Sequence, residues 1–160
     1  MDRIFTDYRF EEPLRGLLHE FKYREGLYLS SFLASLIAHS VSKEALNTQC
    51  LIPIPLHTKR LQQRGFNQAA LLTKHLSNTF GIPYQLSLCK KIQHTPPQAG
   101  LTAEHRRLNL KKAFHVPPMP YQHITLVDDL LTTGSTAHAL ASLLKQQGVI
   151  RVDVWCCAKA

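Results

Sequence analysis

A strand–helix–strand pattern near the end of the chain limits the possible folds more than any other feature of the sequence. Residues 123–128 form a buried apolar run, residues 135–147 repeat apolar side chains at helical spacing, and residues 149–155 form a second strand-like run. Parallel strands need a crossover connection of a dozen or more residues, usually a helix. A strand–helix–strand pattern therefore indicates a parallel pair. The pattern predicts an α/β fold with a mainly parallel sheet flanked by helices.

The preceding residues add elements that suit the same fold. A chain of 160 residues with 44% hydrophobic content is the right size for one compact domain. Asn67 is a good N-cap for a helix over about 67–80, and Gly81 is a suitable stop. The remaining predicted elements are two amphipathic helices at 11–26 and 27–46, a proline-limited strand at 50–56 and a strand at 84–88.

The positive charge is concentrated in the middle of the chain. Residues 51–120 carry 10 basic and 1 acidic side chains, whereas the flanking regions are close to neutral. This favours a phosphate-rich partner, either nucleic acid or a polyphosphate metabolite, although a solvated basic face is the simpler alternative. The aromatic residues of this region look mostly buried, which argues against tight autonomous binding of single-stranded DNA; they are Phe66, Phe80, Tyr84 and Phe114.

The four cysteines indicate reduced, core-facing thiols. No pair has the C-x-x-C spacing, so we predict no protein zinc site. Cys156 and Cys157 are adjacent in a predicted strand and therefore point to opposite faces of the sheet. The sequence shows no charged-then-apolar leader and no apolar run of ~18 residues, so we expect a cytoplasmic protein without membrane insertion.

Two acids and a hydroxyl-rich turn occur between the strand at 123–128 and the helix at 135–147. Asp128 and Asp129 end the strand, and the turn that leads into the helix is Thr132, Thr133, Gly134, Ser135 and Thr136. Free amides at a helix N-terminus favour an anion, and ligands of parallel sheets bind at the carboxyl ends of strands. Because the carboxylates would repel a phosphate, they suit sugar hydroxyls, with magnesium nearby if the ligand is a polyphosphate. The segment predicts a binding site for a sugar phosphate with a free cis-diol.

The segment ITLVDDLLTTGST resembles the phosphoribosyl-pyrophosphate signature of type I phosphoribosyltransferases. By this resemblance, Asp128 and Asp129 bind the ribose hydroxyls, with Mg2+ nearby through the ligand, and residues 132–136 wrap the 5′-phosphate. Residues 1–48 then correspond to the N-terminal helical hood, and residues 49–160 to the phosphoribosyltransferase-like core. Thr125 departs from the usual aliphatic residue, but a β-branched side chain suits a strand.

Three further stretches are similar to the ComF family, also called GntX-like, of competence and DNA-utilisation proteins. They are EEPLRGLLHEFKYREG, IPIPLHTKRLQQRGFNQA and HTPPQAGLTAEHRRLNLKKAF. The resemblance implies a cytoplasmic role in natural transformation and DNA uptake, handling single-stranded DNA, with competence helicase or DNA-translocation proteins as partners. Many members carry an amino-terminal four-cysteine zinc module, and this chain begins after the point where that module would end.

Two basic groups receive roles from the same resemblance. The residues after the strand at 50–56 occupy the place of the pyrophosphate loop, with a solvated loop as the alternative; they are His57, Lys59, Arg60 and Arg64. The second group matches the flexible loop that closes over the site, and it equally suits a basic strip facing DNA. Its members are Thr95, Gln98, Arg106, Arg107, Lys111 and Lys112.

Three functions stay open at this point. The first is a competence protein that binds phosphoribosyl pyrophosphate, with Mg2+, together with single-stranded DNA. The second is an active phosphoribosyltransferase, in which a nitrogen nucleophile displaces pyrophosphate; residues 1–48 do not identify the acceptor. The third is a regulatory protein that senses phosphoribosyl pyrophosphate.

Overall fold

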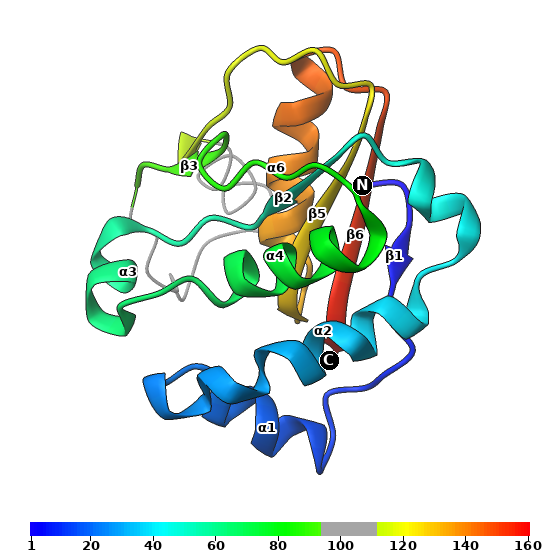
Figure 1. The fold of residues 1–160 in the computed structure, drawn as a ribbon. Coiled ribbons are helices and arrows are strands. Elements are labelled where there is room, and N and C mark those ends of the chain that lie inside the picture. The colour runs from blue at the N-terminus through cyan, green and yellow to red at the C-terminus, as the bar shows by residue number, and fades with distance from the viewer. Residues whose placement is uncertain (94–111) are drawn as a thin grey trace.

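The central sheet has four parallel strands in the order β1–β6–β5–β2 (Figure 1). This computed structural model describes residues 1–93 and 112–160, apart from the side chains of residues 24 and 25. The strands are β1 Ile4–Phe5, β2 Cys50–Pro53, β5 His123–Leu131 and β6 Arg151–Lys159. The predicted parallel arrangement is confirmed, and both C-terminal strands run several residues further than predicted.

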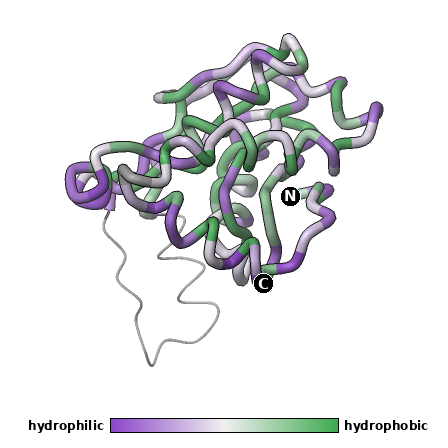
Figure 2. Tube along the Cα trace, turned by 60° about the horizontal axis from the view of Figure 1, so that its bottom comes forward, coloured by the Kyte–Doolittle hydropathy of each residue, from purple (hydrophilic) through white to green (hydrophobic). Residues whose placement is uncertain are grey.

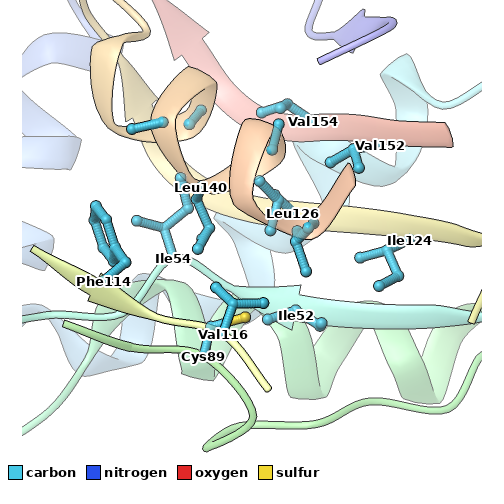
Figure 3. Packing of buried hydrophobic residues seen from close by; sticks show 14 of the residues in the cluster. Ile52, Ile54, Cys89, Phe114, Val116, Ile124, Leu126, Leu140, Val152 and Val154 are labelled. Carbon is cyan, nitrogen blue, oxygen red and sulfur yellow. The ribbon is translucent and has the colours of Figure 1, made fainter. Parts of the chain in front are cut away.

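Helices cover both faces of this sheet. Helix α6 (Ser135–Gln146) packs on one face, and α2 (Ser30–Ser40) and α4 (Gln68–Phe80) pack together on the other (Figure 1). The alternation of side chains along β5 explains the two layers, since Leu126 points to the α6 face and Val127 to the α2/α4 face. Figure 3 shows Leu140 of α6 lying against Leu126 and Val154 of the sheet. Full burial of each such side chain contributes about 1.5–3 kcal/mol.

All four cysteines are free and buried, as predicted. Cys156 belongs to the α6-side core, and its neighbour Cys157 belongs to the core on the α2/α4 side. No helix in the described part of the chain is both long enough and apolar enough to cross a bilayer. The tube in Figure 2 has its apolar residues mainly along the interior strands and a hydrophilic coil at its left edge, where α3 (Thr58–Arg64) lies.

The N-terminal helices are shorter than predicted. Helix α1 covers Leu14–Phe21, and two 3-10 turns follow it in the chain, η1 at Arg24–Leu29 and η2 at Lys43–Asn47. A Cβ at Gly26 would lie 2.3 Å from the carbonyl oxygen of Glu20, so η1 folds tightly back on the end of α1. Helix α1 ends at Phe21, and the chain turns back through η1 instead of continuing the helix to residue 26.

The predicted cap and stop of α4 are confirmed, whereas the predicted strand at 84–88 is wrong. Asn67 accepts a hydrogen bond from the amide of Ala69, and Gly81 ends the helix with φ 68°. Only Tyr84 forms a bridge to β2, at Leu51. The chain then leaves the sheet because Cys89 turns into the α6-side core beside Val116 (Figure 3). It forms a small antiparallel pair instead, β3 Lys90–Lys91 with β4 Phe114–His115.

Candidate functional site

The two acids lie within β5, three and two residues before its end. Asp128 is paired in register with Cys156 of β6, and the Asp129 amide donates a hydrogen bond to Asp128 Oδ1 at 3.0 Å. The strand was expected to end at Asp128, but it continues to Leu131. The carboxylates therefore occupy a rigid, paired stretch of the sheet, which fixes where a ligand bound to them would lie.

The environment of Asp128 disfavours a negative charge. Burial raises the pKa of this carboxyl well above its usual value of 3.8, and the neighbouring Asp129 raises the pKa further by repulsion. The charge of Lys22, just after α1, opposes these effects and lowers the pKa. Two adjacent carboxylates in such surroundings are stabilised by hydrogen-bond donors or by a cation.

The described part of the protein supplies no ion pair for either acid. Every ion pair recorded among residues 1–93 and 112–160 involves other acidic groups. Lys22 influences Asp128 electrostatically and lies in the N-terminal segment, next to Phe21 in the chain. The Phe21 ring contacts the Phe66 ring at a centroid distance of 6.4 Å, which ties this segment to the loop after α3. The sequence did not single out Lys22, since a cation near a helix C-terminus is common.

The turn after β5 has the geometry expected of an anion site. Gly134 has φ 70°, a left-handed conformation that strains other residues, and it directly precedes α6. The N-cap of α6 is Gly134, so in the described structure the N-cap residue provides no side-chain hydrogen bond to the helix. Amides at the start of a helix favour an anion, although the first one here, that of Ser135, already donates to Thr133 Oγ1.

Hydroxyl groups hold this turn in place and add donors to it. The hydroxyls of Thr133 and Ser135 are 2.8 Å apart, and the Ser135 amide lies 3.4 Å from Thr133 Oγ1. Thr132, Thr133 and Ser135 are exposed, whereas Gly134 is buried. The five predicted phosphate-binding residues thus form one continuous turn next to the acids, and their role in phosphate binding stays a prediction.

The predicted pyrophosphate loop starts at the carboxyl end of β2, beside the part of β5 that leads to the two acids. The Ile54 amide donates to the Val127 carbonyl at 2.9 Å, next to Asp128, and Asn67 Nδ2 donates to the Ile54 carbonyl at 3.1 Å. Between these anchors, the chain forms the short helix α3 instead of an open loop. His57 begins the helix, with its Nδ1 accepting from the Lys59 amide at 3.2 Å.

Two of the four predicted pyrophosphate-binding residues, Arg60 and Arg64, have different neighbours. Arg60 is near enough to Lys91 of β3 to lower the pKa of that lysine. Arg64 instead donates to Gln68 Oε1 at 3.2 Å, at the start of α4. Gln68 is 2% exposed, and its Nε2 has no hydrogen-bond partner among the described residues. Sequence reasoning missed Gln68, because Arg64 ends α3 and Gln68 begins α4, so no spacing within one helix links the two residues.

The predicted flexible-loop group lies mostly outside the described residues. Lys112, the exception, is exposed just before β4. Those outside are Thr95, Gln98, Arg106, Arg107 and Lys111. The described part of the chain holds no group of three or more metal-binding side chains. An acid pair alone suits Mg2+ only if a ligand phosphate completes its coordination, which is how this ion is commonly held.

Comparisons with known proteins cover nearly the whole chain. It is 37% identical to Competence protein F of Haemophilus influenzae, over 99% of this chain and 73% of that one. It is 33% identical to DNA utilization protein YhgH of Salmonella typhimurium, over 96% of this chain and 70% of that one. No protein-family model matches it.

A solved structure shares the fold at low sequence identity. The structure of the allosteric regulatory enzyme of purine biosynthesis superposes with a TM-score of 0.57 at 13% identity, over 88% of this chain and 30% of that one. This likeness concerns the fold alone, and it agrees with the open, mainly parallel sheet and flanking helices described above. The predicted fold class, that of type I phosphoribosyltransferases, is confirmed.

Proposed function

The chain belongs to the family of Competence protein F and DNA utilization protein YhgH. On this premise, we propose that it serves DNA uptake and utilisation in the cytoplasm. In this role it binds phosphoribosyl pyrophosphate, with Mg2+, at the Asp128–Thr136 segment and single-stranded DNA through its basic middle region. The proposed role in DNA uptake and utilisation is supported by the names of the relatives, which refer to competence and DNA utilisation.

The observation that carries the proposed ligand is an acid pair that has no ion pair within residues 1–93 and 112–160, next to a turn that suits an anion. Carboxylates accept hydrogen bonds and do not donate them, so Asp128 and Asp129 suit the vicinal hydroxyls of a ribose. The amides and hydroxyls of the Gly134 turn suit the 5′-phosphate, a few residues away on the same segment. One segment thus offers acceptors and donors in the order that a ribose 5-phosphate requires.

Magnesium fits this site as a companion of the ligand. Asp128 and Asp129 would help to hold the ion together with the diphosphate oxygens. When bound, the ion would neutralise part of the diphosphate charge. The chain itself positions the ligand: the turn fixes the phosphate, the acids orient the ribose, and Lys22 adds a positive charge on the side of the N-terminal segment.

Single-stranded DNA is the second proposed ligand. Residues 51–127 contain a single acidic residue, Glu104, and ten basic ones, so this region attracts phosphates and has little to neutralise it internally. Competence helicases or DNA-translocation proteins are the partners that this role suggests. If pyrophosphate is released when a nitrogenous base is added with phosphoribosyl pyrophosphate, the protein is also a transferase.

Calorimetric titration of phosphoribosyl pyrophosphate with Mg2+ tests the ligand proposal. We expect wild-type protein to bind and the variant Asp128→Asn/Asp129→Asn to lose binding. A matched control, Asp7→Asn/Glu44→Gln, removes the same charge from two exposed acids elsewhere and should bind like wild type. Equal binding by all three proteins, or no binding by wild type, contradicts the proposal. The same proteins are tested with a short single-stranded DNA, whose binding should survive in each.

A further inference from the structure

A pocket of about 590 Å3 lies beyond the edge strand β2, between α3, the start of α4 and the segment that leads into β3. Its apolar lining includes Leu56 and Leu61 on the α3 side and Leu86 and Ile92 on the β3 side. Two cations, Lys90 and Lys91, line it as well, and none of the described lining residues is a carboxylate. The pocket therefore combines apolar walls with a positive rim.

The walls of this pocket are anchored to the core. Cys89 is 3% exposed and packs in the α6-side core, and Phe114 of β4 packs there too (Figure 3). A parallel bridge joins His57, the residue before α3, to Lys91 of β3, and thus links the two sides of the pocket. Because one wall is packed on the core and a bridge links it to the other wall, the pocket is present without a ligand, which lowers the cost of binding.

The positive rim has no internal neutralisation in the described structure. No ion pair recorded in the described structure involves a residue of 51–93 or 112–122. Lys91 is partly buried with its ammonium 5.6 Å from the Phe114 ring centroid, and burial and the charge of Arg60 lower its pKa. Lys90 and Arg60 are exposed. Crowded cations of this kind are stabilised by an external anion.

Apolar walls and unneutralised cations together fit a nucleotide of a single strand. We propose that this pocket receives an unstacked base of single-stranded DNA, while the adjoining phosphates lie against Lys90, Lys91 and Arg60. Every base has apolar faces that pack on such walls, and contacts of this kind are tolerant of sequence. In a duplex the bases are paired and stacked, so a duplex would engage only the rim.

The acid pair and the phosphate turn of the proposed site for phosphoribosyl pyrophosphate belong to β5 and the start of α6, whereas the pocket is built from α3, α4 and the segment around β3. Arg60 of α3, which was predicted to bind pyrophosphate, belongs to both proposals. The base-pocket proposal rests on the DNA-binding part of the proposed function. It does not depend on whether phosphoribosyl pyrophosphate binds.

Fluorescence anisotropy with a labelled oligothymidylate, longer than the ~4–16 nucleotides that one such site covers, tests the proposal. Two exposed positions can be changed with little risk to folding, Ile92→Glu in the wall and Lys90→Glu on the rim. Lys74→Glu on the exposed side of α4 is the matched control, because it makes the same charge change without lining the pocket. Far-ultraviolet circular dichroism and the melting temperature of each variant serve as the check that it is folded.

We expect both pocket variants to weaken DNA binding by about tenfold or more and Lys74→Glu to weaken it by about twofold or less. A duplex of the same length should bind more weakly than the single strand and should respond to Lys90→Glu but not to Ile92→Glu. The base pocket is overturned if Ile92→Glu binds DNA like wild type, or if Lys74→Glu is as harmful as Lys90→Glu. If wild type does not bind the single strand at all, the DNA-binding part of the proposed function fails with it. Vesicles of anionic lipid that bind with the same pattern of variants would also overturn it.

Discussion

Two neighbouring strands of the sheet carry carboxylates that the protein treats in opposite ways. Asp153 of β6 is fully buried and has protein partners, with Arg151 at 2.7 Å and His123 at 3.0 Å. Asp128 and Asp129 of β5 lie toward the other end of the same parallel sheet, and no ion pair with the described residues neutralises them. Within the described residues, the sheet therefore neutralises an acid at its amino-terminal end and not at its carboxyl end.

This difference is the one expected if Asp153 stabilises the fold and Asp128 and Asp129 bind a ligand. Removing the partners of a buried carboxylate leaves an uncompensated charge and strongly lowers the stability of the fold. A pair left without cations costs stability in the free protein, and such a cost persists at sites where binding recovers it. The comparison predicts opposite effects when each carboxylate is removed.

The largest expected effect is the loss of Asp153. Asp153→Ala leaves Arg151 and His123 without their acceptor, so we expect the free energy of unfolding to fall by about 3 kcal/mol. This is the lower end of the range for buried pairs, because the Arg151 side chain is 32% exposed. Denaturant unfolding measures the change. A loss below about 1 kcal/mol, the value of an exposed pair, would show that the comparison is wrong.

The next effect concerns the turn that should bind phosphate. Gly134→Ala and Gly81→Ala both place a side chain at positive φ, 70° and 68°, and each should lower the free energy of unfolding by about 1–2 kcal/mol. Only Gly134→Ala should also weaken the binding of phosphoribosyl pyrophosphate, by roughly tenfold or more if one charge-assisted contact is lost. Thermal unfolding and calorimetry separate the two properties. Equal affinity for both variants would remove the turn from the site.

Asp128→Asn should stabilise the free protein while it weakens ligand binding. The pKa of Asp128 is raised in the folded state above its usual 3.8, so the folded protein holds this proton more tightly than the unfolded chain. Wild-type stability is therefore lost as the pH rises from about 4 through the raised pKa, and the variant avoids this loss. At neutral pH we expect a melting temperature higher by roughly 2–4 °C, the change that ~1 kcal/mol produces in a domain of this size. A difference that does not disappear in acid would contradict this explanation.

The smallest effect is expected for Lys22, the cation that influences Asp128 from the N-terminal segment. Lys22→Ala removes an attraction for the polyphosphate comparable to an exposed ion pair, which corresponds to a loss of affinity of up to about fivefold. Calorimetry in low and high salt should show the difference shrinking as salt is added. Lys43→Ala, an exposed cation of η2, is the control and should leave the affinity unchanged.

The local patterns of the sequence were sufficient for most of the fold. The parallel strands, α4 with its Asn67 cap, and the division of Cys156 and Cys157 between two cores depend on neighbours in the chain, so they could be predicted. The strand at 84–88 could not be judged correctly, because its fate depends on Cys89 turning toward Val116, which is distant in sequence.

The site was predictable in part for the same reason. The acids and the Gly134 turn lie on one continuous segment, whereas Lys22 and Gln68 reach the site region only through tertiary packing. The neutralisation of Asp153 was likewise hidden, since it depends on the register that places His123 opposite Arg151. That register also left Asp128 opposite a cysteine and far from a basic residue in the adjacent strand.

The adjacent residues Cys156 and Cys157 can be used to measure how the two helical layers separate from the sheet. The Cys157 thiol donates to the Leu33 carbonyl of α2 at 3.7 Å, so it becomes accessible only when the N-terminal helices lift from the sheet. Cys156 lies under α6, on the opposite face. Pulsed alkylation followed by mass spectrometry would therefore measure a separate rate of exposure for each of the two neighbouring thiols. Unequal rates would show that the N-terminal layer opens independently, and equal rates that the sheet loses both covers in one cooperative event.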